Sequence, residues 1–264
     1  MARDYRFSPK LNKRRVLSHA EYTVYAVNGF AVRNVAQPVE EFGNYATQDE
    51  FPDLIPKGEI WISEKIAAKE GVFFIANALT RMARFAAGAT DKAEEDGLDV
   101  ERAQREKING IAFRDGKPHA RVPAEVYLDR YIELPDPKGP PVEVWRVDGN
   151  VVRSYYKTDY TEGGHGIVYP WVPKAQIWIE DGVDHRELPF IVVHEYIERR
   201  LMRDEKLDYD TAHPICSAVE FDLRKREGAT PLLVPGRRKL GKADLLKLAG
   251  EEVYEYVLRK YVRK

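Results

Sequence analysis

The sequence is poor in sulfur and in long apolar runs. It has a single cysteine, Cys216, and only three methionines. One cysteine cannot form an intramolecular disulfide, so the fold does not depend on an oxidising compartment. No apolar stretch approaches the roughly 18 residues that cross a bilayer, and the N-terminal stretch lacks the apolar centre of a secretory signal. These absences argue against a disulfide scaffold and a membrane span, and we expect a cytoplasmic protein.

An excess of either charge is also missing. The 42 lysines and arginines balance the 43 aspartates and glutamates, which leaves a net charge of -1. A protein whose main partner is nucleic acid usually carries a strong basic excess, so we do not expect that partner. The 32% of charged and 44% of hydrophobic residues fit a folded, soluble chain. The abundance of Lys, Arg and Glu is typical of proteins from hot environments.

The chain contains two similar halves. Four stretches of the first half match four of the second in the same order: VYAVNGFAVRN (24–34) with VWRVDGNVVRS (144–154), IPKGEIWIS (55–63) with VPKAQIWIE (172–180), VFFIANALTRMARF (72–85) with PFIVVHEYIERRLM (189–202), and GLDVERAQREK (97–107) with KLDYDTAHPIC (206–216). Self-similarity of this kind predicts two copies of one structural unit.

The patterns predict an α+β fold. Each unit is expected to hold a β-hairpin, a short strand with an Ile-Trp-Ile core and two helices. Asn28-Gly29 and Asp148-Gly149 supply the type I′ turns of the hairpins. The stretch 242–264 has the apolar spacing of one amphipathic helix that docks onto the domain. The predicted division is 1–115 for the first unit, 116–228 for the second and 229–264 for the C-terminal helix.

The two copies differ in their ionisable residues. Where the second copy has His194, Glu195, Glu198 and His213, the first has Asn77, Ala78, Arg81 and Gln104. If these groups served folding alone, both copies would need them. The second copy is therefore expected to carry a site and the first to be scaffold.

His194 and Glu198 lie four residues apart, so on a helix they share one face. In the related H-E-x-x-H zinc helix, the first and fifth residues bind the metal and the second is the general base. Here the fifth residue is Glu198. We expect His194 and Glu198 to bind a divalent metal, with zinc as the first candidate, and Glu195 to be the base.

A third ligand is expected from the next helix, which begins near Asp208. His213 and Glu220 are seven residues apart and share a face of it. His213 completes a set of two histidines and one carboxylate. Glu220 either replaces His213 as the metal ligand or orients a histidine from behind.

The stretch TDYTEGGHG (158–166) has no counterpart in the first copy. Its glycines allow a ligand to approach the backbone closely, and polar groups lie beside them. The residues expected to contact substrate are Asp159, Glu162, Gly163, Gly164 and His165. The alternative is a flexible turn before a strand.

Across residues 144–224 the chain resembles an uncharacterised family of proteins, many from phages and bacterial prophages. The resemblance rests on VDGNVVRSYYKTDYTEGGHGIVYPWVPKAQIWIED, on HEYIERRLM and on LDYDTAHPICSAVE. The family has no assigned activity. The resemblance implies only that His194, Glu195, Glu198, His213 and Glu220 occupy its recurrent polar positions, with a helix similar to that of the zincins.

The sequence favours a metal-dependent hydrolase of minimal zincin type, most plausibly a peptidase with a peptide or protein substrate. The strand at 177–179 would offer an edge to an extended peptide. The alternative is a non-catalytic binding protein in which the polar cluster is an ion-pair network or a structural metal site. Nuclease activity is disfavoured by the near-neutral charge.

Overall fold

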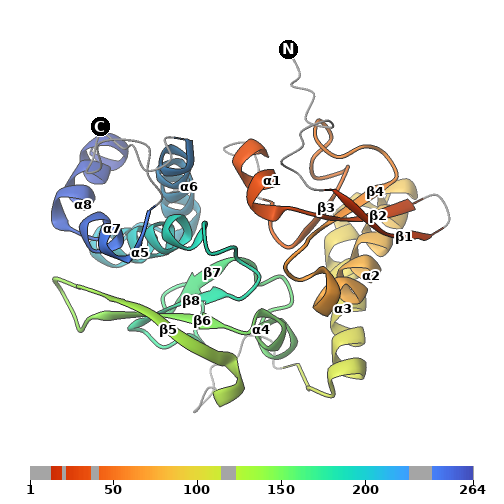
Figure 1. The fold of residues 1–264 in the computed structure, drawn as a ribbon, viewed down its shortest axis with the longest axis horizontal. Helices are drawn as coiled ribbons and strands as arrows, with labels where there is room; N and C mark the ends of the chain where they lie inside the picture. Colours follow the sequence, from red (N-terminus) through yellow and green to blue (C-terminus); the bar gives the residue numbers. More distant parts are fainter. Residues whose placement is uncertain (1–12, 20–21, 37–41, 114–122, 226–239, 264) are drawn as a thin grey trace. The chain divides into compact units, whose positions relative to one another are not determined.

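The computed structural model describes residues 13–19, 22–36, 42–113, 123–225 and 240–263. The chain forms two compact units, which we describe separately. The first unit comprises Met1–Gly116 and Gly149–Thr161, and the second comprises Lys117–Asp148 and Glu162–Lys264. Both predicted domain boundaries lie outside the described residues, whereas 149–161 belongs to the first unit. The fold is mixed α+β, with a four-stranded sheet in each unit (Figure 1).

The first unit begins with two strands, continues to a pair of long helices and includes one short helix from a later segment of the chain. Its elements are β1 (Arg14–His19), β2 (Tyr22–Val27), α1 (Gly29–Ala36), β3 (Tyr45–Thr47), β4 (Glu59–Ser63), α2 (Ala67–Ala86), the 3-10 turn η3 (Thr90–Lys92), α3 (Ala93–Asn109) and, from the later segment, α4 (Gly149–Tyr155).

The second unit has four strands followed by helices. They are the 3-10 turn η4 (Ala124–Val126), β5 (Tyr127–Leu134), β6 (Val142–Val147), β7 (Gly163–His165), β8 (Gln176–Glu180), α5 (Leu188–Asp204), α6 (Tyr209–Lys225), α7 (Lys242–Leu248), α8 (Glu251–Val257) and the π-helical turn η5 (Leu258–Val262).

The two sheets have the same strand order and the same pairing directions. The orders are β1-β2-β4-β3 and β5-β6-β8-β7. In each, the first two strands are antiparallel, the next pair is parallel and the last pair is antiparallel. Trp61 pairs with Ala46 in one sheet as Trp178 pairs with Gly164 in the other. Positions in β3 and β7 can therefore be compared directly.

Alternation along β4 places apolar side chains on both faces of the first sheet. Ile60 and Ile62 pack with Phe74 of α2 on one face. Trp61 packs on the other face with Val32 of α1 and with apolar residues of the segment between β3 and β4. In the second unit Ile177, Trp178 and Ile179 are likewise fully buried.

The predicted hairpins at 24–34 and 144–154 are wrong, because β2 is followed directly by α1 and β6 by α4. The side chain of Asn28 caps α1: its Oδ1 accepts a hydrogen bond of 2.9 Å from the backbone N–H of Ala31. Asparagine satisfies a free N–H at a helix start as readily as it forms a tight turn, so the dipeptide fits both structures. The hairpins that do form come one strand earlier, as β1–β2 and β5–β6.

Two further expectations are wrong. The strand at 177–179, within β8, pairs with β6 on one side and β7 on the other, so it has no free edge. The C-terminal stretch forms two short helices, because Gly250 adopts an extended conformation between them. Leu246, in the first of these helices, is 49% exposed. No helix among the described residues is long and apolar enough to span a membrane.

One buried carboxylate ties α5 to the β5–β6 hairpin. Asp136 accepts a hydrogen bond of 2.9 Å from Nη1 of Arg199 and another from Arg203, and its side chain is fully buried. The hydroxyl of Tyr196 also donates to the carbonyl of Pro135, at 2.6 Å. Burial alone would raise the pKa of Asp136, but the hydrogen bonds from Arg203, the Lys138 backbone and Arg199 lower it to about 2.

We expect Asp136→Asn to lower the free energy of unfolding by about 1–2 kcal/mol at pH 7. The folded-state pKa lies below the ordinary value of 3.8, so this stability is present above about pH 4 and is lost as the pH falls toward 2. Urea unfolding of both proteins at pH 7 and pH 3.5 should show the difference shrinking in acid. Asp129→Asn, which removes an exposed partner of Arg146, is the control and should change stability by less. An equal loss in both variants would contradict the role of Asp136.

Candidate metal centre

Helix α5 presents the expected histidine and glutamates inside the second unit. All residues of α5 from Leu188 to Leu201 are buried. His194 and Glu198, one turn apart, are 4% and 2% exposed, and Glu195 between them is 8% exposed. Ionisable groups at such depth need partners, because an unpaired buried charge is costly.

The partners come from β7 and from α6. His165 is the last residue of β7 and is fully buried. Helix α6 begins after Asp208, whose Oδ1 accepts a hydrogen bond of 2.9 Å from the backbone N–H of Thr211, as expected of an N-cap. It brings His213 and Glu220 to α5, although Pro214 lies within it.

Three donor atoms converge on one point. Nε2 of His194 lies 3.1 Å from Nδ1 of His213, and that nitrogen lies 2.8 Å from Oε2 of Glu198. Nε2 of His194 and Oε2 of Glu198 are 3.5 Å apart. Atoms bound tetrahedrally to zinc at ordinary bond lengths lie about 3.3 Å apart. The donor types and their spacing therefore fit a divalent metal held by two imidazoles and one carboxylate.

Glu220 fixes the orientation of His194. Its Oε2 lies 2.9 Å from Nδ1 of His194, so Nδ1–H donates to it and Nε2 points toward His213 and Glu198. Burial would raise the pKa of Glu220, but Arg224 and His194 hold it well below its usual range. Of the two roles expected for Glu220, the structure places it in the orienting one, behind the ring and outside the converging donors.

His165 supports Glu198 in a similar way. Its Nδ1 accepts a hydrogen bond of 3.3 Å from the backbone N–H of Ile167, so the ring proton resides on Nε2 and is donated to Oε1 of Glu198 at 3.1 Å. Burial lowers the pKa of His165, which keeps the ring neutral. We therefore assign His165 to positioning Glu198. A metal bound at Nε2 would require that nitrogen to lose its proton while Nδ1 stayed an acceptor.

Glu195 occupies a space that only glycine leaves open. A Cβ on Gly163 would meet Oε1 of Glu195 at 3.1 Å and Cδ1 of Ile179 at 2.9 Å. The corresponding strand position in the first sheet holds Tyr45. Burial, and next the charge of Glu198, raise the pKa of Glu195 to about 8. Such a carboxyl group can exchange a proton near neutral pH, as a general acid–base requires.

The structure does not bring all the residues that were expected to contact substrate to one place. Gly163, Gly164 and His165 form β7, a strand and not a flexible turn. Glu162 adopts a positive φ of 56° and its backbone N–H donates to Glu180 at 2.7 Å. Asp159 belongs to the first unit, where it pairs with Lys157 at 3.0 Å.

A similar network of buried charges occurs in both units, and in the second unit it lies behind the three donor atoms. In the second unit Nε of Arg224 donates to Glu220 at 2.7 Å, and its Nη1 donates to Glu187 at 2.9 Å. In the first unit Arg105 makes the same two bonds, at 2.8 and 2.9 Å, to Glu101 and Glu70. Nδ2 of Asn77 donates to Glu101 at 2.7 Å, as His194 does to Glu220.

This correspondence corrects the predicted alignment of the second helices. Glu101 takes the place of Glu220, so the positions shift by 119 residues and not by 109. Glu94, not Gln104, then corresponds to His213. Sequence reasoning also missed Glu187 and Arg224. Their signal was present, since Glu70 and Arg105 are identical residues at the matching places.

The chain matches no protein-family model, no curated protein and no solved structure. The resemblance to the phage family therefore stays a prediction.

Nitrogen NMR of the imidazole rings tests the assigned proton positions. In the metal-free protein at pH 7 we expect His165 as a neutral ring protonated at Nε2, and His194 with a proton on Nδ1. The exposed His185 provides a reference ring outside the cluster. A His165 ring protonated at Nδ1 would contradict its assignment and make Nε2 available as a ligand.

Proposed function

We propose that the second unit binds a divalent metal, with zinc as the first candidate, and uses it to hydrolyse a carbonyl substrate such as a peptide bond. His194, Glu198 and His213 hold the ion. The observation that carries this proposal is the convergence of their three donor atoms within 2.8–3.5 Å, with Glu220 and His165 fixing two of them from behind.

The chain's own residues have separate tasks in this reaction. A divalent cation supplies Lewis acidity, which makes water nucleophilic near neutral pH and polarises a carbonyl. Glu195 accepts the proton of the attacking water and returns it to the leaving group. Glu220 accepts the hydrogen bond from Nδ1 of His194, so that Nε2 is the nitrogen that faces the ion, and His165 holds the second oxygen of Glu198. His213, whose side chain is 28% exposed, lies where the cluster reaches solvent.

The α5 helix supports a site similar to that of the zincins, because the proposed metal ligands occupy positions one and five and a glutamate occupies position two. Glu198 departs from the histidine of that pattern. We also propose that the two units descend from one duplicated unit. Identical strand orders and the matched Arg–Glu networks support this, and Asn77, Ala78 and Arg81 then mark a first unit without the metal donors.

A second candidate function is a purely structural ion-pair network. It is favoured by the burial of His194, Glu195 and Glu198 and by the first unit, in which a related network contains no histidine. The two candidates differ in one measurable property, because only the first requires tight metal binding.

Calorimetric titration with zinc, manganese and nickel tests the metal site. The unmutated protein should bind one ion per chain, and His213→Ala should weaken binding by about 10²-fold or more through loss of a ligand. His185→Ala removes an exposed histidine outside the cluster and should bind normally. If none of the three metals binds at neutral pH, the metal proposal fails and the ion-pair network stands.

Glu195→Gln tests the hydrolase proposal. It should retain the metal stoichiometry and the fold, and it should reduce peptide cleavage by about 10²–10⁴-fold, the usual contribution of a general base. Glu205→Gln makes the same change at the end of α5 and should cleave normally. Equal cleavage by Glu195→Gln and the unmutated protein would contradict the role of Glu195. Metal binding without cleavage of any peptide library would favour a structural site.

A further inference from the structure

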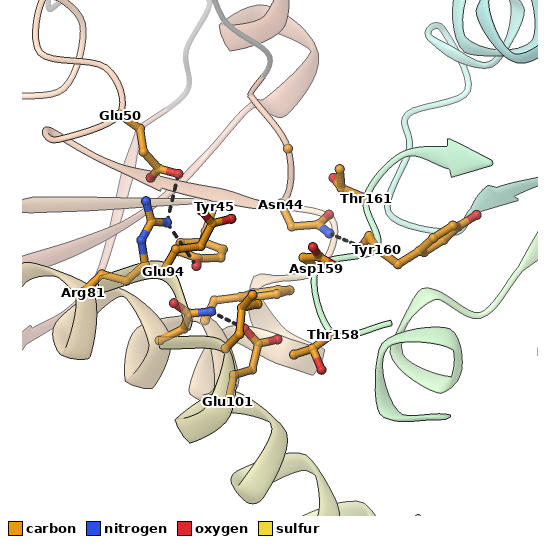
Figure 2. Close-up of a pocket in the computed structure, with 14 residues that line it drawn as sticks. Asn44, Tyr45, Glu50, Arg81, Glu94, Glu101, Thr158, Asp159, Tyr160 and Thr161 are labelled. Carbon is orange, nitrogen blue, oxygen red and sulfur yellow. Dashed lines mark hydrogen bonds and ion pairs between the residues drawn. The ribbon is translucent and has the colours of Figure 1, made fainter. Parts of the chain in front are cut away.

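The first unit contains a cavity of about 200 Å³ between β3, α2, α3 and the segment after α4. It occupies the place that corresponds to the metal centre of the other unit, since Asn77, Arg81 and Glu94 correspond to His194, Glu198 and His213. The side chains around it come from separate parts of the first unit (Figure 2). The residues used below are Tyr45, Phe74, Asn77, Glu94, Glu101 and Thr158.

Two buried oxygen atoms of this lining have no hydrogen-bond partner among the described residues. They are Oδ1 of Asn77 and Oγ1 of Thr158, in residues that are 1% and 4% exposed. A buried polar atom without a partner is costly, and such atoms are rare in folded proteins. Oγ1 of Thr158 can accept a hydrogen bond, so a ligand with an N–H group would satisfy it, whereas Oδ1 of Asn77 lies against Gly97 of α3, where a Cβ would meet it at 2.3 Å. Nε of Arg81 is also buried without a hydrogen-bond partner among the described residues, and it can donate to an acceptor atom of the same ligand.

The charges around the cavity favour a cation. Arg81 is the cationic member of the lining, and its Nη1 donates to Glu50 at 2.9 Å and to the hydroxyl of Tyr45 at 3.4 Å, as Figure 2 shows. Glu101 is paired with Arg105, and burial raises its pKa. Glu94 has no ion-pair partner among the described residues. The lining therefore keeps one uncompensated carboxylate.

Aromatic faces form part of the wall. The rings of Tyr45 and Phe74 stack with centroids 5.1 Å apart and an angle of 21° between their planes. Aromatic faces attract ammonium and guanidinium groups, and Arg105 and Arg153 already lie over the ring of Phe74, at 5.4 and 5.7 Å from its centroid. The cavity thus combines the ring of Tyr45, the carboxylate of Glu94 and the unpartnered hydroxyl of Thr158, and each of these features suits the same chemical group.

We propose that this cavity binds a small organic cation, a primary ammonium or a guanidinium group. The group comes from a free amine or from a lysine or arginine side chain of a peptide. The site is independent of the metal centre, because its residues all belong to the first unit.

Calorimetry on the full chain with excess EDTA tests the proposal without interference from metal. The probes are putrescine, agmatine and an N-acetylated, C-amidated arginine, which separates the free-amine source from the peptide source. Butanediol is the neutral analogue of putrescine, and acetate is the anionic probe. We expect saturable binding of at least one cationic probe and none of butanediol or acetate.

Matched variants locate the binding. Glu94→Gln should weaken it about fivefold, as expected for loss of one partly solvated charge partner. Glu95→Gln makes the same change at the neighbouring exposed position of α3, outside the cavity lining, and should bind normally. Thr158→Val should weaken binding by about fivefold through loss of a hydrogen bond, yet leave thermal stability unchanged or higher, because its hydroxyl has no partner in the part of the chain that the structure describes.

Each outcome of these titrations either supports or overturns the proposal. Binding of a cationic probe that is weakened by Glu94→Gln and Thr158→Val but not by Glu95→Gln supports the proposal. Absence of binding at millimolar concentrations of all three cationic probes overturns it, as does equal binding by all variants. Preferential binding of acetate would also overturn it, by assigning the cavity to Arg81 and an anion.

Discussion

The hydrogen bond from His194 to Glu220 is the interaction on which the second unit's polar centre depends. It holds the ring so that Nε2 faces His213 and Glu198, at 3.1 and 3.5 Å. Glu220 can remain charged at this depth because Arg224 neutralises it, and Glu187 in turn pairs with Arg224. A buried network of charged groups is stable only when each group has its hydrogen-bond partners. The three donor atoms and the ion pairs behind them therefore depend on one another.

The same framework supports different chemistry in the two units. In the first unit the Arg105 network ends at Asn77, a short amide, and Tyr45 takes the strand position that Gly163 holds in the second. Asn77 and Ala78 are smaller than His194 and Glu195, and a cavity with acidic and aromatic walls lies beside Asn77. In the second unit the glycine admits Glu195 and the histidines fill the space. A few side chains on one shared arrangement of sheet and helices thus decide between a cluster of histidines and glutamates and an open pocket.

Sequence patterns predicted the helix that carries His194, Glu195 and Glu198, because helical spacing fixes which residues share a face. They also predicted that His213 of the next helix lies close to it. They failed where one signal fits two structures. Asn28-Gly29 is typical of both a hairpin turn and a helix start, and the contact of α1 with the sheet decides between them. The offset between α3 and α6 is marked in the sequence by the identical pairs Glu101/Glu220 and Arg105/Arg224. Two identical residues in otherwise dissimilar helices do not fix an alignment, and the buried bonds of these residues do. The position of β8 inside its sheet depends on long-range pairing with β6 and β7, which local patterns do not encode.

The most direct test of the metal centre is X-ray absorption at the zinc K edge, on protein loaded with one equivalent of zinc at neutral pH. The account predicts a first shell of nitrogen and oxygen only, at about 2.0–2.2 Å, with the outer-shell scattering of two imidazoles. Parallel loading of His213→Ala should reduce that scattering to one imidazole. A shell without imidazole scattering, or one unchanged by His213→Ala, would contradict the proposed donor set.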